Sequence, residues 1–168
     1  FPLCEYQGGG EAATLEPLHE HLFEYKTHMM QNYGAGVQAC YRGPRLYDTP
    51  ETQAAVTEVI QWYKKYRDIL NSDMIHLRRP DARDWDGFIH VNPHKKEKGL
   101  AMFFNPTHQE ITRTIHIPLY YTGLTQTARI REKEQKPVTY KLNRDYTVEL
   151  TVKIPANGYT WYVVEAAD

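Results

Sequence analysis

The chain has 168 residues, a formal net charge of −1 and an isoelectric point near 6.8. A nucleic-acid-binding protein needs a basic surface, so this charge balance excludes that class. No window approaches the roughly 20 apolar residues of a transmembrane helix, which excludes a helical membrane span. A chain of this length can form one well-buried domain or two small units.

Two features of the composition leave alternatives open. Aromatic residues make up 12% of the chain, with 13 Tyr. They are compatible with platforms on which sugars stack, but amphipathic rings that line a core and its rim are the favoured interpretation. Cys4 and Cys40 are the only cysteines. Two cysteines do not make a disulfide framework, so their pairing stays open, and small buried thiols are favoured.

The first part of the chain alternates short apolar runs with helical patterns. Residues 1–7 and Val37–Tyr41 are predicted strands. Thr14 is expected to cap a helix that starts with the next residues and ends at Gly34. Thr49–Glu51 opens a second helix by the same capping logic. The order strand, helix, strand, helix is typical of βα units with a parallel sheet, and these two could be the last of a longer barrel.

From Asn71 onward the apolar pattern has a period of two, which indicates strands. One run alternates without interruption and turns five side chains inward: Tyr146, Val148, Leu150, Val152 and Ile154. Pro155–Gly158 is the predicted turn before a last strand, Tyr159–Val164. Seven or eight short strands are typical of an antiparallel sandwich.

The fold class we predict is therefore α/β followed by all-β. Residues 1–72 are assigned to the terminal βα units of an incomplete TIM-type (β/α)8 barrel, and residues 73–168 to an antiparallel β-sandwich.

Two strands in the middle of the sandwich are predicted to form a β-hairpin. Gly99–Phe104 is apolar throughout, which favours a central strand buried on both faces. Ile111–Leu119 alternates apolar and polar residues. Between them, Asn105–Glu110 has the composition of a tight turn, because Pro presets φ and Asn tolerates turn geometry.

Candidate site residues follow from the predicted parallel strands, because βα units place reactive groups at the carboxyl ends of their strands. A carboxylate, phenols and guanidinium groups at those ends could orient a polyhydroxylated ligand. The candidate catalytic residue is Glu5, and the candidate substrate-binding residues are Tyr6, Gln7, Tyr41, Arg42 and Arg45. Alternatively, Glu5 and Arg42 form a structural ion pair between neighbouring strands.

Two other stretches match site motifs only loosely. Gly8-x-Gly10-x-x-Ala13 fits a dinucleotide fingerprint, but the helix cap Thr14 lies beyond the glycines and no strand-end acid follows at the usual distance. Asp81–Gly87 resembles a calcium loop, but Ala82 occupies the first ligand position. We therefore predict a turn at Asp81–Gly87, and neither a metal site nor a cofactor.

Three segments resemble the carboxyl-terminal portion of alpha-galactosidase-like glycoside hydrolases. They are Trp62–Leu70, Ile75–Pro80 and Gly99–Pro106. In that group the last barrel helix runs into an antiparallel sandwich, which typically carries a strand ending in Asn-Pro and a closing strand after a Pro-x-x-Gly turn. The resemblance extends over about the whole chain, and its motifs are architectural rather than catalytic.

The resemblance implies a part of a glycoside hydrolase that acts on carbohydrate, with the sandwich supporting the barrel. Such enzymes use two carboxylates, which usually lie on earlier barrel strands, so the expected partner is an N-terminal barrel portion of the same protein. The chain starts with Phe1 rather than Met, and we expect a processed or excised piece. Likeness to bacterial polysaccharide-degrading enzymes implies an exported protein, periplasmic or secreted. The alternative is a non-catalytic carbohydrate-binding or structural β-sandwich module.

Overall fold

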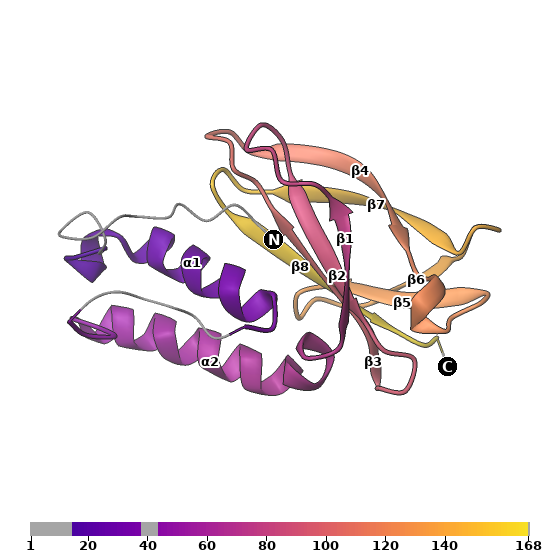
Figure 1. Ribbon diagram of the computed structural model, residues 1–168, viewed down its shortest axis with the longest axis horizontal. Helices are drawn as coiled ribbons and strands as arrows, with labels where there is room; N and C mark the ends of the chain where they lie inside the picture. The colour runs from indigo at the N-terminus through magenta and orange to yellow at the C-terminus, as the bar shows by residue number, and fades with distance from the viewer. Residues whose placement is uncertain (1–14, 38–43, 168) are drawn as a thin grey trace. The chain divides into compact units, whose positions relative to one another are not determined.

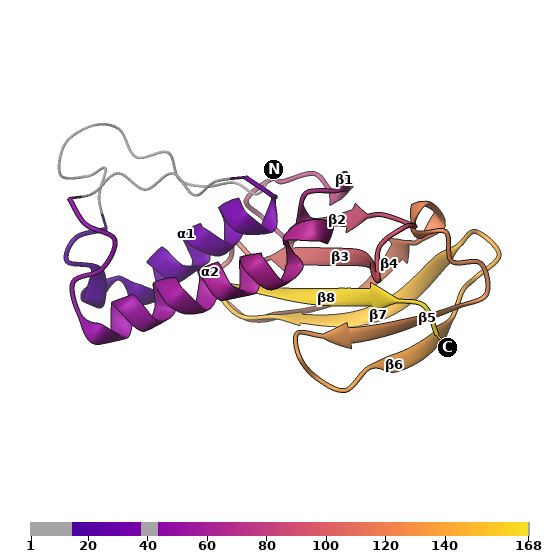
Figure 2. The same cartoon turned by 90° about the horizontal axis from the view of Figure 1, so that it is seen from below.

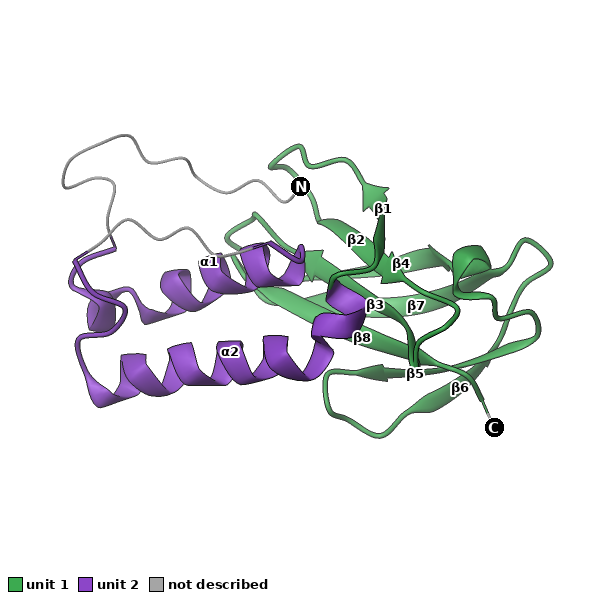
Figure 3. Ribbon diagram, turned by 60° about the horizontal axis from the view of Figure 1, so that its bottom comes forward, with its two compact units in different colours: residues 1–3, 71–168 green, residues 4–70 purple. Residues whose placement is uncertain are grey.

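The computed structural model describes residues 15–37 and 44–167. The chain divides after Leu70 into a helical unit and a strand unit (Figure 3). The predicted strands at residues 1–7 and 37–41 lie outside the described residues, apart from Val37, which belongs to no strand. The parallel sheet and the barrel therefore remain predictions.

The helical unit contains a short 3-10 helix, η2 (Leu18–Glu20), and two α-helices, α1 (Leu22–Gly34) and α2 (Pro50–Leu70). The predicted start of α2 is confirmed. The Thr52 N–H lies 3.3 Å from the Thr49 hydroxyl, and the Gln53 N–H donates to the Thr49 carbonyl. The first backbone N–H groups of a helix lack intrahelical partners, so these contacts fix where α2 begins. Neither of the two α-helices is long and apolar enough to cross a membrane.

The predicted start of α1 is wrong, because α1 begins at Leu22 rather than just after Thr14. Pro17 is in an extended conformation, and the main-chain N–H of His19 donates to the carboxylate of Asp48. The N–H groups of Glu20 and His21 donate to Pro17 and Leu18, so this segment forms the separate 3-10 helix η2 instead of the first turn of α1. The predicted end at Gly34 is confirmed, although the positive φ lies at Gly36.

The two α-helices run side by side in the same direction (Figure 1). Lys26 near the start of α1 pairs with Glu58, and Tyr33 near its end stacks on Tyr63 at 5.1 Å between ring centroids. The first contact lies nearer the start of both helices and the second lies further along both, so the two helices are parallel. A parallel pair requires the connecting chain to return along the length of the helices, as a crossover does in βα units.

The strand unit consists of two antiparallel sheets (Figures 1 and 2). The larger sheet has the order β1-β2-β3-β8-β5-β6, and the smaller pairs β4 with β7. The strands are β1 (Asp73–Arg78), β2 (Asp86–Val91), β3 (Glu97–Phe104), β4 (Ile111–Pro118), β5 (Thr127–Glu132), β6 (Val138–Lys141), β7 (Thr147–Ile154) and β8 (Tyr159–Glu165). The sandwich predicted from the period-two pattern is confirmed.

The core of the strand unit lies between the sheets. β7 supplies every second side chain to it, from Val148 to Ile154, as predicted. Tyr146 precedes the strand, in a turn, and packs only partly against the core. In β3, Ala101 and Phe103 belong to this core, while Leu100 and Met102 on the other face are buried as well. β3 is therefore a central strand buried on both faces, as its unbroken apolar run predicts.

The predicted hairpin between β3 and β4 is wrong. β3 pairs with β2 and β8, whereas β4 pairs with β7 in the other sheet. Residues 105–110 thus carry the chain from one sheet to the other. A hairpin and a sheet-to-sheet connection can use the same turn residues, and only the pairing partners distinguish them.

Candidate functional site

Five of the six predicted site residues lie outside the described residues: Glu5, Tyr6, Gln7, Tyr41 and Arg42. The same holds for Cys4, Cys40 and the dinucleotide-like Gly8–Ala13. Their roles stay predictions. Arg45 is the predicted site residue whose surroundings can be described.

Arg45 forms a two-point ion pair with Glu16. Its Nε and Nη2 lie 3.3 and 3.0 Å from the two carboxylate oxygens. The Arg45 side chain is 53% exposed and that of Glu16 is 20% exposed. A planar guanidinium held at two points has a fixed orientation.

His19 and Asp48 form a second ion pair in the helical unit. The Asp48 Oδ2 atom lies 2.7 Å from His19 Nδ1 and 3.1 Å from the His19 main-chain nitrogen. Its Oδ1 atom accepts a hydrogen bond from the hydroxyl of Thr52, which is fully buried. A carboxylate only accepts, so Nδ1 of His19 carries the proton and Nε2 is directed away from Asp48.

The electrostatics of this pair favour the charged state of both partners. The hydrogen bond that His19 donates to Asp48 raises the pKa of His19. Desolvation raises the pKa of Asp48, but the hydrogen bonds from His19 and Thr52 outweigh it and lower that pKa to about 2. The charge of Arg45 also acts on His19 and lowers its pKa. Glu16, His19, Arg45 and Asp48 therefore form one polar cluster.

The polar cluster joins two segments of the chain. Residues 16–19 follow the first predicted strand, and residues 45–48 follow the second. Both carboxylates of the cluster are paired with cations, Asp48 with His19 and Glu16 with Arg45. Sequence reasoning missed Glu16, His19 and Asp48. The capping pattern of Thr49 and Thr52 marks the start of α2, but nothing local connects Asp48 with a histidine 29 residues earlier.

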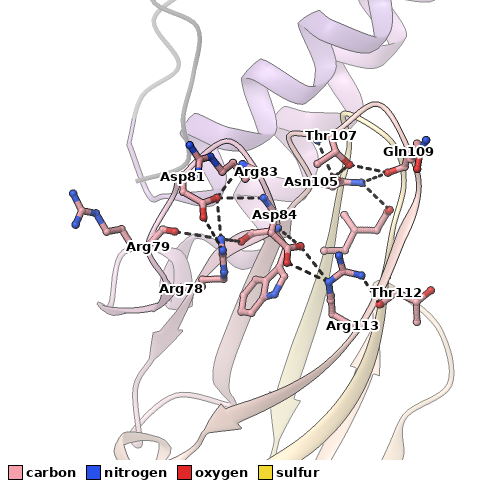
Figure 4. A network of polar contacts seen from close by, with 12 residues as sticks. Arg78, Arg79, Asp81, Arg83, Asp84, Asn105, Thr107, Gln109, Thr112 and Arg113 are labelled. Carbon is pink, nitrogen blue, oxygen red and sulfur yellow. Dashed lines mark hydrogen bonds and ion pairs between the residues drawn. The ribbon is translucent and has the colours of Figure 1, made fainter.

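The calcium-like segment forms the turn between β1 and β2, as predicted, and continues into the first two residues of β2. Two of its carboxylates, Asp81 and Asp84, are paired with arginine side chains (Figure 4). Asp81 accepts hydrogen bonds from Arg78 and from the Arg83 N–H, which hold the pKa of this carboxyl well below its usual range. Asp84 accepts from Nε of Arg113 on β4, which ties the turn to the smaller sheet. The network holds a loop in place.

Asp86 differs from these paired carboxylates. It begins β2, is 2% exposed, and its Oδ1 atom has no hydrogen-bond partner among the described residues. Burial raises its pKa to about 6. A carboxyl that exchanges its proton near neutrality is a candidate for proton transfer. It is also the group most able to make the stability of the strand unit depend on pH.

No model of a protein family matches the sequence, and no curated protein is significantly similar to it. Solved structures do share its fold. Alpha-galactosidase I from Mortierella vinacea superposes with a TM-score of 0.56 at 14% identity, over 84% of this chain and 35% of the enzyme. An alpha-amylase from Geobacillus thermoleovorans, complexed with acarbose, superposes with a TM-score of 0.60 at 15% identity, over 88% of this chain and 34% of the enzyme.

The chain thus spans about a third of the length of these enzymes. At these identities the likeness concerns the fold. The resemblance to alpha-galactosidase-like glycoside hydrolases that the sequence predicts is confirmed at that level: this chain folds like a part of alpha-galactosidase and alpha-amylase enzymes.

Proposed function

We propose that this chain is the carboxyl-terminal part of a glycoside hydrolase. In this proposal residues 73–168 form a sandwich that supports the catalytic barrel, and residues 1–72 supply the last βα units of that barrel. One observation carries the proposal. Residues 71–168 are 98 of the 168 residues, about 58% of the chain, yet the alignments extend over 84% and 88% of it. The likeness therefore includes helical residues as well as the sandwich.

The parallel direction of α1 and α2 supports the same proposal. A stand-alone sandwich has no use for two helices that run in parallel and need a long return between them. Successive βα units produce such a pair, because each helix leads back to the next parallel strand. The return in this chain contains the predicted strand Val37–Tyr41.

In the proposed enzyme the strand ends line the sugar site. Glu5, Tyr6 and Gln7 would follow one barrel strand, and Tyr41 and Arg42 the next. Arg45, oriented by Glu16, would contribute donors for sugar hydroxyls at the same end. Glycoside hydrolysis requires two carboxylates in different roles, and Glu5 alone cannot supply both. The catalytic pair is therefore expected on strands that precede this chain.

The test begins with the intact mass of the natural gene product, compared with the 19.7 kDa of this chain. A product more than about twice as heavy leaves room for a barrel of roughly 250 residues. That product and the 168-residue chain are then assayed in parallel on 4-nitrophenyl α-galactoside, 4-nitrophenyl α-glucoside and soluble starch. We expect hydrolysis by the natural product and none by the chain.

Other outcomes contradict the proposal. Turnover by the chain alone would mean that it carries a complete catalytic site. A natural product of the same mass that hydrolyses nothing would favour the alternative, a non-catalytic carbohydrate-binding or structural module. Within an active product, Glu5→Gln tests the role of Glu5, and Glu11→Gln, six residues further along the chain, is the matched control.

A further inference from the structure

Tyr120 and Tyr121 form an exposed aromatic pair on the strand unit. Their side chains are 61% and 63% exposed, the highest values among the large apolar side chains of the described residues. They belong to a short 3-10 helix, η3 (Tyr120–Thr122), which follows β4. Neighbouring exposed aromatic rings in a folded chain are unusual, because they gain no burial in the chain itself.

A third ring completes the group. Tyr120 lies edge-on between two neighbours, with its ring centroid 5.2 Å from that of Tyr121 and 5.3 Å from that of Tyr146. The interplanar angles are 88° and 78°. We call Tyr120, Tyr121 and Tyr146 the tyrosine platform. Perpendicular rings at these distances are favourable for aromatic pairs. The exposure of Tyr120 and Tyr121 leaves these two rings accessible to a ligand.

The backbone under the platform is held firmly. Leu119 and Thr122, on either side of the two exposed tyrosines, are both buried. The Thr122 hydroxyl donates to the Leu119 carbonyl, and the Leu119 N–H donates to the Tyr146 carbonyl at 2.8 Å. Gly123 ends the short helix with a φ of 76°. The tyrosines are thus presented by an ordered turn that is joined to the turn before β7.

Tyr146 itself occupies a strained position. Its φ is 61°, a left-handed conformation that costs energy for a residue with a side chain. The surrounding bonds maintain it, since its N–H donates to the Asn143 carbonyl while its own carbonyl accepts from Leu119. The side chain packs partly against the core. A strained residue that anchors an exposed group is a frequent feature of binding sites.

Polar residues directly precede the third tyrosine of the platform in the chain. Asn143, Arg144 and Asp145 immediately precede Tyr146 and are exposed. The Asp145 carboxylate accepts hydrogen bonds from the main chain and hydroxyl of Thr147, which lowers its pKa and keeps it ionised. Exposed rings with amide, guanidinium and carboxylate residues nearby in the chain can combine apolar contact with hydroxyl recognition.

From this arrangement we propose that the tyrosine platform is a surface carbohydrate-binding site, which stacks the apolar face of a pyranose ring on Tyr120 or Tyr121 and binds its hydroxyls through Asn143, Arg144 and Asp145. Sugar C–H groups are attracted to the electron-rich face of a phenol ring. The choice of a polysaccharide as occupant rests on the proposed function. A protein partner, the other common occupant of exposed tyrosines, is an outcome of the test.

The test is affinity electrophoresis of the 168-residue chain in gels with and without soluble starch or galactomannan. We expect retardation in at least one polysaccharide gel. The double variant Tyr120→Ala/Tyr121→Ala should weaken binding at least about tenfold, a loss of about 1.4 kcal/mol. The double variant with Phe at both positions keeps the rings and should bind nearly as the parent does.

The matched control is Tyr47→Ala, since Tyr47 is also an exposed tyrosine, 46% accessible, but belongs to the helical unit. It should leave retardation unchanged. The platform variants replace exposed side chains, and circular dichroism verifies that they fold. No retardation of the parent chain, or equal retardation of parent and double-alanine variant, overturns the proposal. Self-association abolished by the double-alanine variant, without polysaccharide binding, would assign the platform to a protein contact instead.

This experiment does not depend on hydrolysis. If the natural gene product cleaves glycosides but the chain is not retarded, the platform proposal fails alone. If the chain is retarded but the natural product cleaves nothing, the platform stands and the proposed enzyme is wrong.

Discussion

The side-chain amide of Asn105 donates a hydrogen bond of 3.0 Å to the carbonyl oxygen of Pro155, 50 residues further along the chain. The same amide nitrogen lies 2.7 Å from the Gln109 carbonyl and 3.3 Å from that of Ile154. The main-chain N–H of Asn105 donates to Gly158. The Asn-Pro strand end and the Pro-x-x-Gly turn are therefore one structural feature, which joins the end of β3 to the turn between β7 and β8.

Replacing Asn105 should destabilise the strand unit strongly. Asn105 is 2% exposed, and Asn105→Ala leaves the carbonyls around it without their donor. Each buried acceptor left unsatisfied costs about 1–3 kcal/mol, so we expect a loss of about 3 kcal/mol in the free energy of unfolding. Urea denaturation of the chain measures it.

The control for this prediction is Asn143→Ala. The amide of Asn143 is exposed and donates only to the Thr147 hydroxyl among the bonds described here. Asn143→Ala should lower the free energy of unfolding by less than about 1 kcal/mol. Asn105→Asp, which replaces the donor by a further acceptor, should destabilise at least as much as Asn105→Ala. Equal stability of all three variants would contradict the role assigned to Asn105.

Gly87 should not tolerate a side chain. A Cβ atom there would lie 2.5 Å from the main-chain oxygen of Met102 on the neighbouring strand. The backbone of a paired strand cannot move aside as a flexible side chain can. Gly87→Ala should therefore lower the free energy of unfolding by about 3 kcal/mol. Gly99→Ala is the matched control in the same sheet, because its Cβ would meet the Ile89 methyl at 3.2 Å. Gly99→Ala should lower the free energy of unfolding by about 1 kcal/mol or less. Thermal unfolding of both variants measures the difference between them.

Asp86 should make the strand unit less stable as pH rises. Its pKa is about 6 in the folded chain against 3.8 as the ordinary value, so between these values the folded state holds more protons than the unfolded state. The free energy of unfolding then falls with pH across this window and stays low above it. Asp86→Asn removes the buried charge and should stabilise the chain by up to about 3 kcal/mol at pH 7.5.

Asp86→Asn should increase the free energy of unfolding much less at pH 4.5 than at pH 7.5, because Asp86 is largely protonated in the folded chain at pH 4.5. Asp73→Asn makes the same chemical change at an exposed position of the adjacent strand and is the matched control. Urea denaturation at the two pH values gives both differences. A gain that is equal at pH 4.5 and 7.5 would show that the charge of Asp86 is not its cause.

The ion pair of His19 and Asp48 should also be visible in a titration. The His19 pKa is raised, so the pair stabilises the folded chain fully below 6.5 and this contribution is lost as pH rises through the folded value. The lowered pKa of Asp48 makes stability depend on pH in the opposite sense. Its contribution to the stability of the folded chain is lost as pH falls from 3.8 toward about 2. NMR titration of the His19 ring should give a pKa above 6.5, and Asp48→Asn should lower it. An unchanged value in that variant would exclude the pair as the cause.

Several elements of this protein follow from local sequence. Thr49 and Thr52 mark the start of α2 because their hydroxyl groups bond within four residues, and the alternation from Val148 to Ile154 identifies β7 and its inward face. The unbroken apolar run of β3 identifies a central strand. The period of the side chains and the cap of α2 are short-range properties, so the residues alone determine them. The start of α1 differs, because His19 next to it bonds to the distant Asp48.

Only the tertiary structure decided which elements pair and which polar groups meet. The partners of β3, the burial of Asp86, the bond of His19 to Asp48 and the three tyrosines of the platform each join segments that are distant in the chain or depend on what covers them. The physical reason is the same in each case. Burial and pairing depend on which surfaces meet after folding, and neither helical nor strand periodicity carries that information.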